Sequence, residues 1–382
     1  MRWLLIDGFN LVFRSHFAME RSNLRRPSDQ FPTGALHGWM KALLDLRASE
    51  QPDRCAVFFD LGGSDRHLAA LPEYKAQRDK APEVLIQQVG MIRELLDVLG
   101  VVWWEKAGFE GDDLIATVAE HAEKAGQDLI VVTGDRDSYQ LVRDPHIRVL
   151  YNKRGVSDYA LYNEAGILER TGVTPAQYAD YAALRGDPSD NLAGIPGVGE
   201  KTAAKLINQY GDIDGVVAAA EAQTPKLKAG LLEHGERVKR NAEMMILRRD
   251  VPLEVDLNQL APHPDLAGAS RMFEFLEFKT MAKRLSDIAK SLNWETRGDA
   301  APVVAGVVIP DSNEVLGQVA VVESVNEAVK ELSKLQSFVV AAHFDGEPGR
   351  SRVTGVAVVT DQAVGSVMYM PREVFLDNAV TS

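Results

Sequence analysis

The chain has 382 residues, of which 46% are hydrophobic and 25% charged, values typical of a globular protein with two or three domains. No apolar run approaches the roughly 20 residues that span a bilayer, and the N-terminus enters an apolar strand without a signal-peptide cleavage site. These features argue against a membrane protein or a secreted one. The single cysteine, Cys55, cannot form an internal disulfide and lies in an apolar run that predicts a buried core position. We therefore expect a cytoplasmic chain without a membrane partner.

The net charge of −13 at first argues against nucleic-acid binding. However, a site that gathers carboxylates to hold cations is itself acidic, and bound metal reverses its local field. Basic side chains need to cluster only on the face that contacts nucleic acid. The charge therefore does not exclude a nucleic-acid partner.

Residues 1 to about 150 alternate short apolar strands with segments of helical period. Strands are predicted at 3–6, 56–59, 101–104, 129–133 and 148–151, and helices at 35–48, 83–99 and 112–124. This alternation predicts an α/β fold whose central sheet is mostly parallel and flanked by helices on both faces. Such sheets bind ligands outside the carboxyl ends of their strands.

The rest of the chain divides into three stretches. Residues from about 160 to 250 indicate helices punctuated by glycine and proline, and 251–290 a closing segment with one helix near 271–285. A polar linker is predicted at 291–302. Beyond it, strands are predicted at 303–308, 318–322, 338–342, 355–359 and 365–369, with a helix at 325–335. This tail, 303–382, is typical of a partial α/β domain.

Acidic residues follow four of the predicted strands. They are Asp7, Asp60, the run Glu110-Gly111-Asp112-Asp113, and Asp135 with Asp137. A single acid after a strand is more often a loop or capping residue, but four placements on four strands are hard to assign to capping alone. Because the carboxyl ends of parallel strands meet at one edge of the sheet, we expect these acids to converge there.

Converging carboxylates repel one another strongly unless cations lie among them. Hard oxygen ligands favour Mg²⁺, Mn²⁺ or Ca²⁺ over Zn²⁺, and the sequence has no competing Cys/His cluster. Two such ions about 4 Å apart would activate a water and stabilise the leaving oxygen in phosphodiester hydrolysis. Asp187 and Asp190, from the helical region, would complete the set.

The run from Gly194 to Ala203 is a helix-hairpin-helix turn. Its glycines, Gly194, Gly197 and Gly199, permit a tight backbone, and the helix that follows begins by offering free N–H groups to a phosphate. Such contacts hold a duplex without reading its sequence. The alternative is a plain packing joint between two helices. The run is not a P-loop, because Gly199 is followed by Glu200 instead of lysine.

Together these residues resemble the 5′-nuclease family, which includes the flap endonucleases and the N-terminal 5′→3′ exonuclease domain of bacterial DNA polymerase I. The resemblance covers about residues 1–290, and no acid of the family motifs is missing. The matching motifs are Asp7-Gly8 with Arg14, the turn Pro32-Thr33-Gly34-Ala35, Phe59-Asp60, Tyr74-Lys75 with Arg78, Glu110-Gly111-Asp112-Asp113, Thr133-Gly134-Asp135-Arg136-Asp137, and Gly186-Asp187 to Asp190-Asn191 with the hairpin.

The resemblance implies a PIN-like nuclease core over 1–165, with a helical arch at about 70–95, and a helix-hairpin-helix subdomain over 166–290. It also implies two or more Mg²⁺ or Mn²⁺ ions. The first metal site would use Asp7, Asp60, Glu110 and Asp112, the second Asp135, Asp137, Asp187 and Asp190, with Asp113 shared or supporting.

By the same resemblance, the Tyr74-Lys75-x-x-Arg78 motif would act at the scissile phosphate. Lys75 and Arg78 would hold that phosphate, and Arg14 would support a nearby one. An ordinary solvated helix face is the alternative for Lys75 and Arg78. The hairpin would bind DNA and carry a K⁺ ion on backbone carbonyls. Its DNA-binding residues would be Gly194, Gly197, Val198, Gly199, Lys201 and Thr202.

The tail is more faintly similar to the start of a 3′–5′ exonuclease-like domain. Asp345 and Glu347 have the Asp-x-Glu spacing of that domain's first metal motif, but its other motifs are absent, so we expect the pair to be inactive. The chain would then be a fragment of a DNA polymerase I without polymerase activity.

The leading hypothesis is a monomeric, nucleoid-associated 5′→3′ exonuclease and flap endonuclease acting on DNA with a 5′ end, flap or nick in replication and repair. One alternative is a catalytically silent module that binds DNA junctions, although the intact set of acids argues against it. The other is a related nuclease that acts on RNA.

Overall fold

A computed structural model describes residues 1–78, 81–253, 260–291, 319–322, 324–334, 340–344, 353–361 and 366–375. The chain divides into two compact units, Met1–Gly298 and Asp299–Ser382. Among the helices in these ranges, none is long and apolar enough to cross a membrane. The predicted linker, apart from Ser291, lies outside the described residues, as do the predicted strand at 303–308 and the Asp345/Glu347 pair.

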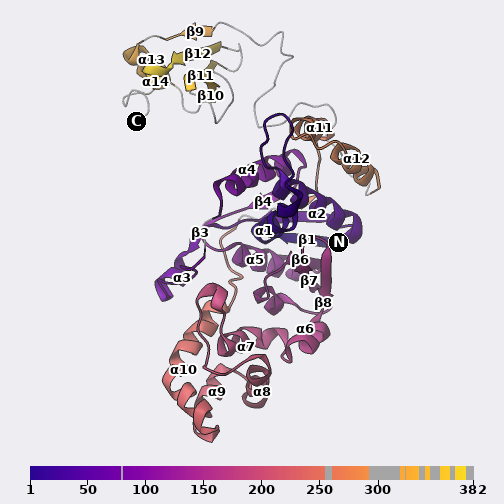
Figure 1. Cartoon of the computed structure of the whole chain (residues 1–382), viewed down its shortest axis with the longest axis vertical. Helices are drawn as coiled ribbons and strands as arrows, with labels where there is room; N and C mark the ends of the chain where they lie inside the picture. The colour runs from indigo at the N-terminus through magenta and orange to yellow at the C-terminus, as the bar shows by residue number, and fades with distance from the viewer. Residues whose placement is uncertain are drawn as a thin grey trace. The chain divides into compact units, whose positions relative to one another are not determined.

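A six-stranded sheet forms the centre of the first unit (Figure 1). Its order is β4-β2-β1-β6-β7-β8, and neighbouring strands are parallel except for β7 and β8, which are antiparallel. The strands are β1 (Arg2–Asp7), β2 (Arg54–Phe58), β4 (Val102–Trp104), β6 (Asp128–Thr133), β7 (Ile147–Arg154) and β8 (Asp158–Tyr162). The predicted α/β fold with a mostly parallel sheet is confirmed, and β8 is an antiparallel edge strand that the sequence did not indicate.

Both faces of this sheet are buried, which explains why its strands are nearly continuous apolar runs. In β1, Trp3 and Leu5 pack into one core, whereas Leu4 and Ile6 pack into the other. On the Leu4 side lie α1 (Gly8–Met19), α2 (Gly34–Glu50) and α4 (Glu83–Val98), and on the Trp3 side lies α5 (Gly111–Lys124). The helices predicted at 35–48, 83–99 and 112–124 are therefore confirmed.

The segment predicted to form an arch, about 70–95, has two different halves. Residues 71–78, which follow the short helix α3 (Asp65–Ala70), form turns. From residue 83 onward the chain is α4, whose Leu85, Ile92 and Leu96 are buried in the core with α2. Residues 83–95 therefore form an amphipathic helix with one face in the core, and the predicted arch at about 70–95 stays a prediction.

The helical region follows the edge strand β8 and includes α6 (Glu164–Thr171), α7 (Tyr178–Arg185), α8 (Glu200–Tyr210), α9 (Ile213–Ala218) and α10 (Pro225–Met245) (Figure 1). Short 3₁₀ helices occur at η1 (Glu20–Ser22), η2 (Asp137–Leu141), η3 (Pro175–Gln177), η4 (Pro188–Asp190) and η5 (Ala220–Ala222). The core of this region is continuous with the one beneath α5. The two parts of the first unit are thereby packed together.

The closing segment contains two helices, α11 (Leu266–Phe275) and α12 (Met281–Ser291), where one was predicted. The break lies at Glu277, whose φ of 58° is left-handed and cannot continue a helix. The turn allows Phe273 on one helix and Leu285 on the other to be buried in the same core as α2 and α4. Helical period alone did not reveal the break, because both helices bury apolar residues at similar spacing.

Short elements complete the described parts of both units. In the first unit, β3 (Leu61–Ser64) pairs with β5 (Ala107–Gly108), a pair too short to be predicted. In the second unit a sheet has the order β10-β11-β12-β9, packed with α13 and α14 around a small core. Its elements are β9 (Val319–Val321), α13 (Val325–Leu332), β10 (Val340–Phe344), β11 (Val353–Asp361), β12 (Ser366–Pro371) and α14 (Arg372–Phe375).

Candidate active site

Asp7 lies at the carboxyl end of the central strand β1, where it also caps helix α1. Its carboxylate accepts hydrogen bonds from the Asn10 backbone N–H at 2.9 Å and from the Thr133 hydroxyl at 2.8 Å. Thr133 is the last residue of the neighbouring parallel strand β6. Two adjacent strand ends therefore fix the orientation of this carboxylate.

Asp60 and the acids that begin α5 lie at the same edge of the sheet. Asp60 follows β2, and its Oδ1 accepts the Gly111 N–H at 2.5 Å. Glu110 is the N-cap residue of α5, and Asp112 lies in the first turn of that helix. These acids therefore converge at the carboxyl ends of the parallel strands, as predicted.

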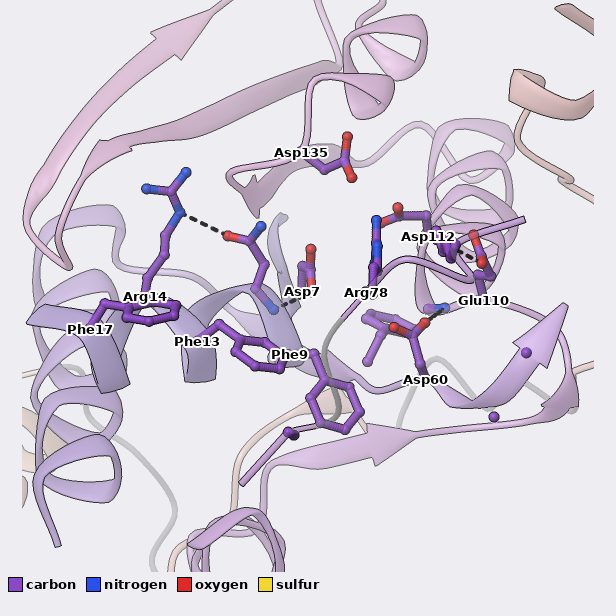
Figure 2. A pocket seen from close by; sticks show the side chains of 17 residues that line it. Asp7, Phe9, Phe13, Arg14, Phe17, Asp60, Arg78, Glu110, Asp112 and Asp135 are labelled. Carbon is purple, nitrogen blue, oxygen red and sulfur yellow. Dashed lines mark hydrogen bonds and ion pairs between the residues drawn. The ribbon is translucent and has the colours of Figure 1, made fainter. Parts of the chain in front are cut away.

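A cavity of about 1110 Å³ opens at this edge. Figure 2 shows Asp7, Asp60, Asp112 and Asp135 directed into it from four different segments. On the other side of the cavity, α1 contributes Arg14 and an aromatic stripe at helical spacing, Phe9, Phe13 and Phe17. The cavity is thus acidic along the strand ends and aromatic along one helix.

The remaining acids come from η2 and from the loop between α7 and the hairpin. The Asp137 N–H donates to Oδ1 of Asp135 at 2.9 Å, so these two acids share one tight turn. Asp187 caps η4 by accepting from Ser189, and Asp190 ends the same short helix. Burial, and after it the charges of Asp190 and Asp187, raise the pKa of both Asp135 and Asp137, so the two pairs of acids interact electrostatically.

The mutual repulsion of these acids is visible in their proton affinities. Burial raises the pKa of Asp7 to about 7, and the charges of Asp60 and Asp135 add to it against the opposing hydrogen bonds. Burial and the neighbouring carboxylates likewise raise the pKa of Asp112 and of Asp137 well above the ordinary value. A cation placed among them would remove this penalty.

Glu110 is the exception, since it already has cationic and hydrogen-bonding partners. Burial works against its ionisation, but His67 and the Lys75 ammonium together lower the pKa of Glu110 to about 2. Lys75 Nζ lies 2.7 Å from Oε1 of Glu110, and His67 Nδ1 lies 3.7 Å from Oε2. His67, which the sequence did not single out, is fixed in turn by the Met244 carbonyl at 2.8 Å.

Lys75 and Arg78 point into the acidic site from the turn segment 71–78. Arg78 Nη2 lies 2.5 Å from Oδ1 of Asp190, and Lys75 Nζ lies 3.8 Å from its Oδ2. Tyr74 donates its hydroxyl to the same Oδ2 at 2.9 Å. Lys75 has a left-handed backbone, with φ of 55°, and its N–H donates to the Asp190 carbonyl at 3.3 Å. The alternative of an ordinary solvated helix face therefore does not describe this pair.

The donor set is composed of carboxylate oxygens, which fits hard divalent cations. Among the described residues no three acidic, histidine or cysteine side chains are gathered around one point as they stand. Two of the acids, Glu110 and Asp190, are instead paired with Lys75 and Arg78. Ion binding at these two positions thus requires the carboxylates to exchange an organic cation for a metal ion.

Asp113 differs from its neighbours in α5. Its side chain is buried, and Oδ1 accepts the backbone N–H of Arg248 at 2.8 Å in the segment that returns from α10. It does not line the cavity that contains Asp112. Asp113 thus fastens the returning segment to α5, and its predicted shared or supporting role at the metal site stays a prediction.

The glycine hairpin joins α7 to α8. A Cβ at Gly194 would lie 2.5 Å from the backbone of Arg185 and Gly186, so only glycine permits this close approach. Val198 is buried, and its N–H donates to the Ile195 carbonyl. Gly194 and Val198, predicted among the DNA contacts, therefore stabilise the turn, the first by close backbone packing and the second as a buried side chain.

The exposed part of the hairpin has a different character. Gly197 has φ of 82°, and a Cβ there would lie 3.6 Å from the Lys226 ammonium of α10. Gly199 is the N-cap of α8 and supplies no side-chain acceptor, so the first N–H groups of the helix remain available to an anion. Lys201 and Thr202 are exposed in that first turn.

Two family models match consecutive stretches of the chain. Residues 2–172 match the 5′-3′ exonuclease N-terminal resolvase-like domain, and residues 173–266 match the 5′-3′ exonuclease C-terminal SAM fold. The chain belongs to the 5′-3′ exonuclease family. Within this family, DNA polymerase I of Mycobacterium bovis is 40% identical over 308 residues, which are 80% of this chain and 34% of that protein. The chain spans about a third of the length of the curated relatives it matches.

Solved structures show the same fold for this member of the 5′-3′ exonuclease family. The T5 D15 protein co-crystallised with metal ions is 19% identical, with a TM-score of 0.55 over 76% of this chain and 100% of that one. The bacteriophage T5 D15 flap endonuclease in a pseudo-enzyme-product complex with DNA and metal ions is also 19% identical, with a TM-score of 0.53 over 77% and 100%. The fold class implied by the sequence resemblance is thereby confirmed.

Asn10 is a residue of the site that the sequence reasoning missed. Its Oδ1 accepts from Arg14 Nε at 3.1 Å and from the Gly134 N–H at 2.9 Å, while its own N–H donates to Asp7. A Cβ at Gly134 would collide with the Arg14 guanidinium. Asn10 therefore links β1, α1 and the loop after β6. The available signal was its position three residues after an N-cap aspartate, which places it on the first turn facing that aspartate.

In chelator, we expect the thermal unfolding temperature to rise when the pH is lowered from 8 to 6. The folded-state pKa of Asp7 is about 7, above the unfolded value of 3.8, so the folded protein binds more protons in this window and is stabilised as the pH falls. Crossing about one pKa unit gives about 1.4 kcal/mol, which corresponds to about 2 °C for a unit of the size of Met1–Gly298. An unfolding temperature that is flat or falls between pH 8 and 6 would contradict this electrostatic account.

Proposed function

We propose that the chain hydrolyses DNA phosphodiester bonds at or near a 5′ end, as a structure-specific 5′→3′ exonuclease and flap endonuclease dependent on divalent metal ions. The observation that carries this proposal is the convergence of acids from successive parallel strands on one cavity, next to a hairpin with available N–H groups. Family membership and the nuclease fold support it.

The acids divide into two groups for metal binding. The first group is Asp7, Asp60, Glu110 and Asp112, and the second is Asp135, Asp137, Asp187 and Asp190. When bound, Mg²⁺ or Mn²⁺ ions would polarise the phosphate and lower the pKa of the attacking water. The T5 relatives of the same fold were crystallised with metal ions, which supports divalent cations without selecting one.

Lys75 and Arg78 hold the scissile phosphate in this proposal. In the structure without DNA they pair with Glu110 and Asp190, and divalent ions that take over these carboxylates would leave both cations free for phosphate oxygens. Tyr74, buried between Glu110 and Asp190, keeps the segment docked. Arg14, held by Asn10 at the mouth of the cavity, binds a neighbouring phosphate.

The helical region, 166–290, grips the duplex while the core, 1–165, cuts. Gly197, Gly199, Lys201 and Thr202 are exposed at the hairpin and offer backbone N–H groups and positive charge to one phosphate run, with Lys226 beside them. Backbone carbonyls of the same turn are where a K⁺ ion would bind. The second unit takes no part in this cleavage.

The biological setting is also a proposal. Relatives of this chain are DNA polymerases I, and a fold neighbour was solved with DNA, so the substrates would be nicks and 5′ flaps of replication and repair. We propose that the active chain is a monomer that works in the cytoplasm at the nucleoid.

One assay tests the function and its alternatives together. The chain is incubated with a 5′-labelled DNA flap, an RNA flap of the same sequence and a blunt duplex, each with Mg²⁺ and with chelator. We expect cleavage of the DNA flap near its junction in Mg²⁺ and no cleavage in chelator. Preferred cleavage of RNA would indicate an RNA nuclease, and binding without cleavage of any substrate would indicate a silent junction-binding module.

A further inference from the structure

A single carboxylate on the hairpin helix pairs with two arginines that lie close in sequence to the second group of acids. Glu200 is the first residue of α8, directly after the hairpin. Its Oε1 lies 3.0 Å from Arg136 Nη1 and 3.7 Å from Arg185 Nη1. Arg136 stands between Asp135 and Asp137 in the chain, and Arg185 stands two residues before Asp187. Glu200 is therefore connected through these two arginines to the chain segments that carry three of the proposed metal ligands.

The two arginines are held by their own surroundings, which makes them suitable anchors. Arg185 ends α7, its Nε donates to the Gly186 carbonyl at 3.2 Å, and its guanidinium lies 5.6 Å from the Tyr181 ring centroid. Arg136 is the N-cap of η2 in the tight turn closed by Asp137 and Asp135. Motion of Glu200 relative to these anchors would therefore change the distance between the hairpin and the acids.

A carboxylate is an unfavourable neighbour for a phosphate-binding helix end. The N-terminus of α8 offers available N–H groups, yet Glu200 places a negative charge in the same turn. If this helix end served only to bind DNA, a neutral residue at position 200 would repel the phosphate less. As an exposed ion pair, Glu200 also adds little to stability. Its pairing with one arginine at the end of α7 and another at the start of η2 points to a role in alignment instead.

The geometry points to Glu200 as a positioning residue that sets the register between the duplex gripped at the hairpin and the acids that cut it. This inference rests on the proposed nuclease function. Backbone contacts already join the two sides, since the Ile195 N–H donates to the Leu184 carbonyl at 3.0 Å. Arg237 and Asn241 of α10 also donate to the Gly194 and Ala193 carbonyls, and Glu200 adds an ionic contact from the first turn of α8 to the segments that carry the acids.

The test uses the full chain and a 5′ flap labelled so that products are resolved to one nucleotide. Glu200→Gln removes the charge and keeps the shape, and Arg136→Gln removes one partner. Glu233→Gln is the matched control, because Glu233 is an exposed acid of α10 whose only ion pair is with His234 among the described residues. Thermal unfolding and DNA affinity in chelator are measured for every variant.

For Glu200→Gln, we expect DNA affinity in chelator to be unchanged or higher, because a negative charge near phosphate is removed. The single-turnover rate in Mg²⁺ should fall about tenfold, and the products should spread to neighbouring phosphodiester bonds, since small displacements at a reacting centre are costly. Arg136→Gln combined with Glu200→Gln should be no slower than the slower single variant.

Wild-type rate and a single cut position in Glu200→Gln would overturn the inference. So would a loss of the same size in Glu233→Gln, or a rate loss explained entirely by weaker DNA binding. These failures are distinguishable from failure of the proposed function, in which the wild-type chain itself leaves the flap uncut.

Discussion

Replacement of Asp135 or Asp187 by asparagine is expected to abolish Mg²⁺-dependent cleavage of a 5′ flap while DNA binding persists. Each substitution removes one negative ligand charge from the second group of acids, and neither side chain fills the hydrophobic core. Metal ions supply several kcal/mol of transition-state stabilisation, so the single-turnover rate should fall by at least about 10³-fold. DNA affinity should hold or rise, because a charge that repels phosphate is lost.

Asp128→Asn is the matched control for this result. Asp128 begins the same strand, β6, that leads to Asp135, but it lies at the amino end, is exposed and pairs with His146. Its substitution should leave cleavage unchanged. If Asp135→Asn and Asp187→Asn both cut the flap at the wild-type rate, the second group of acids is not part of the catalytic site.

Lys75→Met should slow cleavage by about 10²–10³-fold, the usual cost of removing one donor that stabilises charge in the transition state. The substitution keeps the length and the apolar stem of the side chain, and both residues face the same strain at φ 55°. The same change should tighten divalent metal binding in the absence of DNA. Glu110 and Asp190 lose the ammonium that competes with a metal ion for their oxygens.

These opposite directions separate the proposed role of Lys75 from general damage to the site. Metal affinity is measured by calorimetry with Mn²⁺, and the cleavage rate under single turnover in saturating Mg²⁺. Lys41→Met, an exposed lysine of α2 paired with Asp45, is the control and should change neither quantity. Weaker metal binding together with slower cleavage would show instead that Lys75 merely supports the acids.

The strand ends and the hairpin could be predicted because their signals are local. Asp7 and Asp135 each directly follow an apolar run, and parallel strands place such residues at one edge whatever the loops do. The turn has Gly194 where the backbone approaches Gly186 most closely. In both cases a short stretch of sequence determines the geometry.

Other features depend on partners far away in the chain. Asp113 and Asp112 are adjacent on α5, so helix geometry turns them to different faces, but the partner of Asp113 is the backbone N–H of Arg248, far away in the chain. The role of His67 depends on Met244, 177 residues later. The packing of 83–95 with α2 in one core likewise joins segments that are far apart in the chain. No local pattern in the sequence contains these contacts.

We propose that carboxylates from the ends of parallel strands and from the neighbouring helical region form a site for two divalent cations in a DNA-cutting centre. The most direct measurement is anomalous diffraction from crystals of the chain soaked in Mn²⁺. We expect two peaks, one in the acidic cavity among Asp7, Asp60, Glu110 and Asp112 and one beside it among Asp135, Asp137, Asp187 and Asp190. Crystals that show no peak there, or Mn²⁺ bound only at other surface acids, would contradict the account.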